Sequence, residues 1–146
     1  MKAVYITGAA GILAAALAFV LIRGGAGDGP APGDRPEAPP GAPLAAVEMP
    51  ELSATAQLGR KAFAENCAEC HGPDASGRQG SGPPLIHKIY EPGHHADMAI
   101  VLAAQRGVTA HHWRFGNMPP VPGLTERELG SIVVYIREVQ RANGIE

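Results

Sequence analysis

The sequence predicts a small all-α domain of about three main helices joined by long loops, behind an apolar N-terminal segment and a proline-rich stretch. Apolar residues recur at helical spacing in three stretches of the chain, and no run alternates apolar and polar residues as a strand pair would. The chain has 146 residues, and once the N-terminal third is set aside the remainder has room for one compact domain.

Composition excludes several classes of protein. The formal net charge is −2 and basic and acidic residues are interspersed without a basic stripe, so nucleic acid is not expected as a partner. Only two cysteines are present, which excludes a framework of several disulfides. Aromatic residues make up 5% of the chain, a low value for so small a core. A large buried cofactor would supply the missing apolar bulk.

Residues 1–23 are expected to form a membrane anchor. The stretch from Ala3 to Ile22 is uncharged and about 20 residues long, the length of a helix that crosses the hydrocarbon layer of a bilayer. Arg23 follows it directly. The small residues of 24–27 leave a cleaved signal peptide open as the alternative.

Residues 24–50 are rich in glycine, proline and alanine and are expected to form a flexible linker. The many X-Pro steps favour extended backbone, and little apolar bulk is available for burial. The folded domain is therefore expected over residues 51–146.

The first two helices of the domain are predicted from spacing and end signals. Ser53 is a candidate N-cap for a helix that runs toward Cys67. A second helix is expected from Ala96 to Arg106, with Gly107 placed to end it. Between them, the glycines and prolines of residues 74–84 predict a loop.

The last helix has the clearest signals. Thr125 and Glu128 form a capping box, and apolar residues follow at the spacing of one helix face. Asn143-Gly144 is expected to stop it. Long loops in a domain of this size indicate that something other than a sheet organises them.

Cys67-Ala68-Glu69-Cys70-His71 is a C-x-x-C-H motif, the signature of covalent c-type haem attachment. On one helical turn, residues three apart share a face, so both thiols can add to the two vinyl groups at one edge of the porphyrin. His71 then offers Nε2 to the iron. A thioredoxin-like redox pair and half of a zinc site are the alternatives for the cysteines. A redox pair of this kind is typically found in a strand-helix-strand setting. A structural zinc site usually needs a second cysteine pair or a spaced histidine pair.

From about residue 52 to residue 144 the chain resembles the class I cytochrome c family. Gly59 and Phe63 match the N-terminal helix of that family, where a glycine and an aromatic residue pack against an aromatic residue of the C-terminal helix. Tyr135 matches that partner. The resemblance implies a small cytochrome c fold wrapped around one covalent haem c.

Two further segments carry the resemblance. Gly82-Pro83-Pro84-Leu85 is similar to the G-P-x-L segment of the family, which implies that the Pro83 carbonyl accepts the Nδ1 proton of His71 and that Leu85 packs on the haem ring. Such a bond would orient the histidine and raise its basicity. Met118, before Pro119, matches the position of the distal thioether ligand of the iron.

The other methionines are weaker candidates for the iron, because Met49 falls in the expected linker and Met98 on a helix face where a core role is expected. Trp113 and Tyr90 are candidate hydrogen-bond donors to the haem propionates, and Arg114 is a candidate ion-pair partner. Ordinary packing of Trp113 is the alternative.

Two pairs of adjacent histidines, His94-His95 and His111-His112, stand out. They are either solvent-facing or propionate-bonding residues, or a second metal site, since imidazole suits zinc and copper. If each pair lies in a strand-like segment, its two rings point to opposite faces, so each pair would supply only one inward ligand.

A haem iron closed by His71 and Met118 has no vacant position for a substrate, so the resemblance implies an electron carrier rather than an enzyme. The expected partners are a redox donor and a redox acceptor, with the bilayer contacted through the N-terminal helix and no small-molecule substrate. Haem attachment in this family takes place outside the cytoplasm, which implies a single-pass protein of the bacterial inner membrane with a periplasmic haem domain. A haem-bearing sensor or ligand-binding module and an electron-entry subunit of an oxidoreductase complex are the alternatives.

Overall fold

A computed structural model describes residues 38–146, which form one compact unit. Within this range the elements are all helical: α2 (Ala54–Asn66), α3 (Ala68–His71), the 3-10 helix η1 (Lys88–Tyr90), α4 (Asp97–Arg106) and α5 (Glu126–Ala142). Residues 38–146 contain two isolated β-bridges and no strand. The predicted all-α class and its three main helices are therefore confirmed. The expected membrane segment and residues 24–37 of the expected linker lie outside the described residues.

Helix α2 begins and ends where the sequence predicts. The Ser53 hydroxyl accepts a hydrogen bond from the Ala56 amide at 3.2 Å, which satisfies one of the amides left without a partner at the start of a helix. The helix ends at Asn66, and Cys67 leaves the helical conformation.

Helix α5 has the predicted capping box. The Thr125 hydroxyl accepts from the Glu128 amide at 3.3 Å, and the Glu128 carboxylate accepts from the Thr125 amide at 2.8 Å. The helix ends at Ala142, directly before Asn143. Its buried face provides much of the apolar core of residues 38–146.

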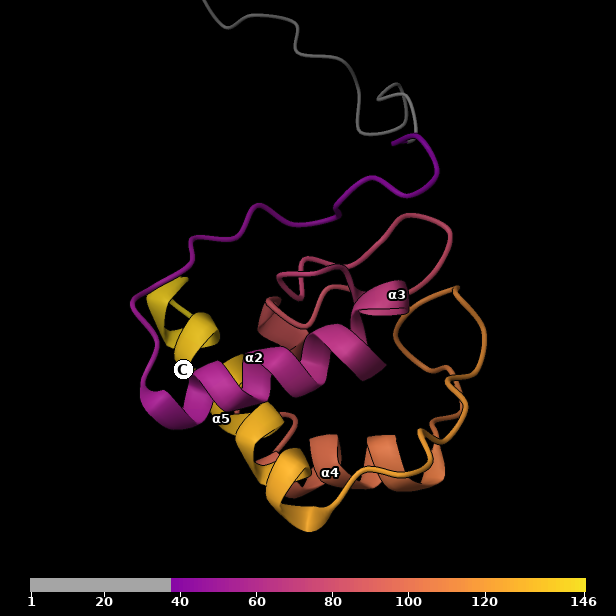
Figure 1. Ribbon diagram of the computed structural model, residues 1–146. Coiled ribbons are helices and arrows are strands. Elements are labelled where there is room, and N and C mark those ends of the chain that lie inside the picture. The colour runs from indigo at the N-terminus through magenta and orange to yellow at the C-terminus, as the bar shows by residue number, and fades with distance from the viewer. Residues whose placement is uncertain (1–37) are drawn as a thin grey trace, which may run out of the picture. The chain divides into compact units, whose positions relative to one another are not determined.

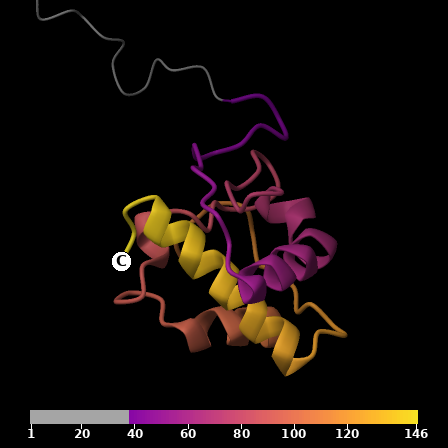
Figure 2. The same ribbon diagram turned by 60° about the vertical axis from the view of Figure 1, so that its left-hand side comes forward.

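Helices α2 and α5 cross in close contact, as Figures 1 and 2 show from two sides. Gly59 stands at the crossing, where a Cβ atom would lie only 1.9 Å from the Ser131 carbonyl oxygen. One turn further along, the rings of Phe63 and Tyr135 pack with centroids 5.4 Å apart. The glycine and the aromatic pair thus occupy the places that the family resemblance implies. The core around them consists of buried apolar side chains: Leu52, Ala56, Ala62, Phe63, Ala75, Ile86, Ile132, Tyr135, Ile136 and Val139.

The compact unit includes residues 38–50, although their composition predicts a flexible linker. The amides of Leu44 and Ala45 donate to the Ser76 carbonyl at 3.1 and 3.0 Å. The Glu48 amide donates to the Asn143 side chain at 2.9 Å, beside the C-terminal end of α5 (Figure 1). Met49 packs against the core. Extended, proline-rich backbone is therefore held here by hydrogen bonds to two distant parts of the chain.

Helix α4 matches its predicted range to within one residue, but Met98 does not have the predicted core role. Its side chain is 61% exposed. No residue of α4 is fully buried, because much of the apolar side of this helix faces a cavity, although α4 contacts α5 and Ile100 packs against the core. Within residues 38–146, no helix is both long enough and apolar enough to cross a membrane.

Candidate functional site: the C-x-x-C-H cavity

The C-x-x-C-H motif forms a helical turn, as its spacing predicts. The amides of Cys70 and His71 both donate to the Cys67 carbonyl, at 3.2 and 2.9 Å, and α3 completes the turn. Cys67 is partly buried and Cys70 is exposed, and both are free thiols in this structure. Burial raises the pKa of the Cys67 thiol to about 11, with a smaller contribution from Cys70. Reactive redox cysteines have lowered pKa values instead, so this environment does not favour the thioredoxin-like alternative.

The His71 ring is oriented by the backbone of a distant loop. Its Nδ1 lies 2.9 Å from the Pro83 carbonyl oxygen, which can only accept, so Nδ1 carries the proton and Nε2 is free to act as a ligand. Burial lowers the pKa of His71, and the hydrogen bond to Pro83 opposes that effect in part. A Cβ atom at Gly82 would lie 2.8 Å from the Cys70 carbonyl oxygen, so a glycine lets this loop approach the motif.

An apolar cavity of about 430 Å³ lies against this motif. Its volume falls within the range of roughly 300–1,000 Å³ that is usual for cofactor and ligand sites. The cavity is lined by the motif, by Leu85, by residues of α2 and α5 that flank the core, and by the apolar side of α4: Ala99, Ile100, Leu102, Ala103 and Ala104. The apolar side of α4 has no fully buried residue, so it is available to pack against a bulky planar group such as haem.

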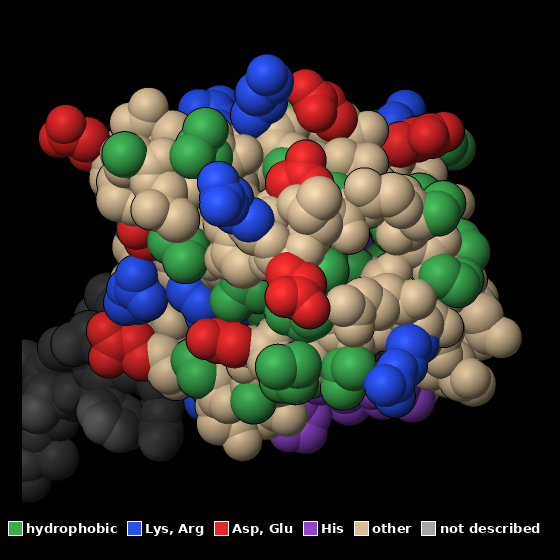
Figure 3. All heavy atoms as spheres, turned by 60° about the horizontal axis from the view of Figure 1, so that its bottom comes forward, with side chains coloured by type: hydrophobic (Ala, Val, Ile, Leu, Met, Phe, Trp, Pro, Cys, Tyr) green, Lys and Arg blue, Asp and Glu red, His purple; other side chains and the backbone are tan. Residues whose placement is uncertain are grey.

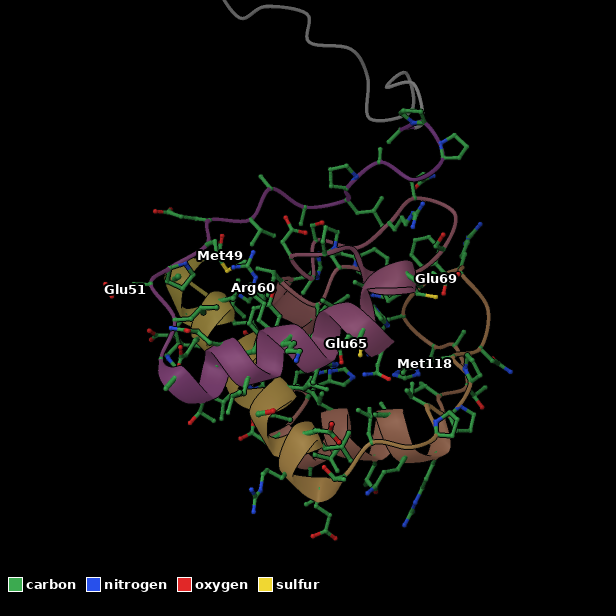
Figure 4. All side chains as sticks on the ribbon, viewed as in Figure 1. Met49, Glu51, Arg60, Glu65, Glu69 and Met118 are labelled. Carbon is green, nitrogen blue, oxygen red and sulfur yellow. The ribbon has the colours of Figure 1, made fainter. Side chains whose placement is uncertain are left out.

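Met118 also lines the cavity, on the loop between α4 and α5 (Figure 4). Its amide and carbonyl both pair with Val108, at 2.9 Å each, which closes the loop of residues 109–117. Gly107 permits this pairing, because its φ is +75° and a Cβ atom there would lie 2.5 Å from the Met118 carbonyl oxygen. The cavity thus brings His71 and Met118 to one space, 47 residues apart in sequence.

Tyr90 and Trp113, the candidate propionate donors, line the cavity, whereas the exposed Arg114 is not among the lining residues. The indole Nε1 of Trp113 is buried without a hydrogen-bond partner. Burial raises the pKa of the Tyr90 hydroxyl, and the Trp113 side chain lowers it to a smaller extent. A buried donor without an acceptor fits a site whose acceptor arrives with a ligand.

The sequence pattern by itself does not mark the cavity-lining residues of α4, or Phe115, as part of a site. For α4 the signal is the apolar stretch that ends at Gly107, and a core face would have the same pattern. An apolar face that lines a cofactor cavity can be told from one that packs in the core only when the position of α4 is known. Arg137 of α5 helps to set that position. This α5 side chain binds the Asp97 carboxylate at 2.7 Å and the Tyr90 carbonyl at 2.6 Å, which holds the start of α4.

Comparison with known proteins identifies the class. Residues 56–140 match the sequence model of the cytochrome c family, and the chain belongs to that family. Membership implies a covalently bound haem c, and Cys67 and Cys70 have the spacing of its attachment motif.

The relatives are subunits of an oxidase. The chain is 33% identical over 92 residues to the cbb3-type cytochrome c oxidase subunit CcoP of Rhodobacter capsulatus, covering 61% of this chain and 30% of that subunit. It is 39% identical over 80 residues to CcoP of Cereibacter sphaeroides, covering 53% of this chain and 25% of that subunit. The chain thus spans less than a third of the length of these curated relatives. No solved structure gives a significant match.

Proposed function

We propose that this chain carries single electrons between redox proteins through one haem c whose iron is bound by His71 and Met118. The observation that carries the proposal is the apolar cavity that Cys67, His71 and Met118 line together. Haem supplies a reversible one-electron change at iron when it is bound. The remaining chemistry comes from the chain itself.

Each residue has a distinct part in this proposal. The thiols of Cys67 and Cys70 form the two thioether links. His71 offers Nε2, with Nδ1–H donated to Pro83. Met118 offers its thioether sulfur, a weak donor that favours the ferrous state and raises the reduction potential. Leu85 and the apolar side of α4 exclude water, which strengthens that effect, and Tyr90 and Trp113 supply donors for the propionates.

The test of iron ligation is the Met118→Ala variant of the haem-loaded protein. We expect it to retain covalent haem, to lose the weak methionine-to-iron charge-transfer band of the oxidised protein, and to bind carbon monoxide readily when reduced. Met98→Ala is the matched control, because Met98 is 61% exposed. If the unmutated protein already binds carbon monoxide readily, the sensor alternative replaces the carrier. If Met118→Ala behaves as wild type, one of the paired histidines is the distal ligand.

A place within an oxidase complex is the second candidate, and the similarity to CcoP favours it. Native electrophoresis of solubilised membranes, followed by haem staining, separates the two. Migration with an oxidase activity supports an electron-entry subunit, whereas migration alone supports a mobile carrier.

We further propose that residues 3–22 anchor the chain in the bacterial inner membrane with the haem domain in the periplasm. The proposal rests on the uncharged length of that segment. Recovery of most of the protein as a soluble periplasmic species with a new N-terminus near Gly27 would contradict it.

A further inference from the structure

The two histidine pairs of this chain converge on one cluster at the surface. The rings of His111 and His112 lie with centroids 4.2 Å apart, and those of His94 and His112 lie 5.3 Å apart. Histidine side chains gather along one edge of the face shown in Figure 3. His94 and His112 are exposed and His95 is partly buried. His95, His111 and His112 also line the cavity described above, so the cluster borders both that cavity and the solvent, and an ion can reach it from the solvent side.

The nitrogens of this cluster have the spacing of metal ligands. One nitrogen each of His94, His95 and His112 lie within 4.8 Å of one another. The Nε2 atoms of His94 and His112 are 3.4 Å apart, which is long for a hydrogen bond. Two nitrogens bound to one tetrahedral Zn²⁺ at about 2.0–2.1 Å are themselves about 3.3–3.4 Å apart.

Hydrogen bonds to backbone carbonyls fix two of the rings in the tautomer that a metal needs. Nδ1 of His95 lies 2.7 Å from the Ile89 carbonyl oxygen, and Nδ1 of His111 lies 2.8 Å from that of Thr109. A carbonyl can only accept, so Nδ1 carries the proton in both rings and Nε2 presents its lone pair. Metal-binding histidines usually show this arrangement, with the second nitrogen hydrogen-bonded to a carbonyl or a carboxylate.

The two segments that carry the histidines are held independently. Arg137, which is 6% exposed, donates to the carbonyls of His95 and Tyr90 and so holds the first segment against α5. The second segment is closed by the pairing of Val108 with Met118 and by a 2.9 Å hydrogen bond from the Ala110 amide to the Asn117 side chain. The backbone segments that carry the ligands are therefore positioned before any ion binds, which lowers the entropic cost of binding.

We propose that His94, His95 and His112 bind one divalent transition-metal ion of the kind that prefers imidazole, such as Zn²⁺, with His111 beside the site. The ion joins the turn of residues 91–95 to the loop that ends at Met118. Three neutral imidazoles suit zinc, copper and nickel and do not suit Mg²⁺ or Ca²⁺, which prefer oxygen ligands. The site consists of residues of this chain alone, and it rests on the proposed function in one respect: with Met118 as the distal haem ligand, these histidines remain free to bind another ion.

The test is titration of the full-length, haem-loaded protein with Zn²⁺ after removal of metals by a chelator, using isothermal titration calorimetry. We expect one Zn²⁺ per chain and no comparable binding of Mg²⁺. His94→Ala and His112→Ala should each weaken binding by more than ~100-fold, since even residues that only support metal ligands contribute about 10- to 100-fold. His87→Ala is the matched control, because His87 lies outside the cluster, and it should bind Zn²⁺ as wild type does.

Visible spectra of the same variants separate this site from the haem. Both cluster variants should keep the methionine-to-iron band of the wild-type protein, which also shows that they are folded. Loss of that band in His94→Ala or His112→Ala would make the histidine a haem ligand and overturn the proposal. Less than one equivalent of Zn²⁺ on the wild type, or unchanged binding by the variants, would overturn it as well.

Discussion

Among single residues, Tyr135 carries an unusual feature. Its ring is fully buried against Phe63, yet its hydroxyl has no hydrogen-bond partner. Burial raises the pKa of this hydroxyl to about 12, with Arg60 lowering it and Asp74 raising it to smaller extents. A buried hydroxyl without a partner costs roughly 1–3 kcal/mol of stability. The ring and the hydroxyl therefore act in opposite directions on the free energy of unfolding.

We predict that Tyr135→Phe leaves the free energy of unfolding unchanged or raises it by up to ~2 kcal/mol, because only the unpartnered hydroxyl is removed. Tyr135→Ala should lower it by about 3–5 kcal/mol, since the ring contact with Phe63 is lost and a cavity forms. Denaturant unfolding of the haem-loaded variants measures both. A clear destabilisation by Tyr135→Phe would mean that the hydroxyl is bonded in solution.

At the scale of elements, the start of α2 is attached to α5 by a carboxylate. The Glu138 oxygens accept from the Ser53 hydroxyl at 2.6 Å and from the Ser53 amide at 3.0 Å. The hydroxyl is the main cause of the lowered pKa of Glu138, the amide and Arg141 lower it further, and desolvation opposes them. The residue that caps α2 is thus oriented by the helix against which α2 packs.

This arrangement predicts a component of stability that depends on acid pH. A carboxyl whose pKa is lower in the folded state stabilises the fold above its unfolded pKa of about 4.3, and this contribution is lost as the pH falls through the folded value. Glu138→Gln should therefore be less stable than wild type near pH 7, and the difference should shrink below about pH 4. Urea unfolding of both proteins across this range is the measurement. Glu51→Gln, which alters an exposed carboxyl just before α2, is the control. A difference that does not vary with pH would assign the effect to shape rather than charge.

The elements show which kinds of signal in the sequence predict structure. The caps of α2 and α5 depend on residues three apart, and the C-x-x-C-H turn on residues three and four apart, so local spacing was sufficient. The histidine pairs were expected to supply one inward ring each, as in strands. That expectation is wrong for His94 and His95, because they lie in a turn and both rings enter the cluster. The segment that brings His95 near His112 is held by a hydrogen bond from Arg137 to the His95 carbonyl. These two residues are 42 positions apart, so local sequence spacing does not reveal their contact.

Over the whole domain, the α2–α5 pair and helix α4 are stabilised by different interactions. Helices α2 and α5 pack directly through a continuous apolar core. Helix α4 has no fully buried residue; Ile100 packs against the core, and the Asp97–Arg137 ion pair and a 2.8 Å hydrogen bond from the Val121 amide to the Ala104 carbonyl hold the helix further. Between α4 and the helix pair lies the cavity of about 430 Å³. The apolar side of α4 is thus left for the cofactor to cover.

We predict that α4 loses its structure in the haem-free protein while α2 and α5 remain more protected. A 10-residue helix is marginal in water by itself, and the apolar area that would stabilise α4 is buried only when haem fills the cavity. A Cys67→Ala/Cys70→Ala variant, which cannot form thioethers, supplies the haem-free chain. Hydrogen exchange followed by mass spectrometry compares it with the haem-loaded wild type. Amides of residues 97–106 should exchange at least ~10-fold faster in the variant, and those of α5 should change less, because local opening free energies follow local burial. Equal protection of α4 in both proteins would show that α4 is folded without haem. A uniform loss of protection across all helices would show that the α2–α5 pair also needs haem to fold.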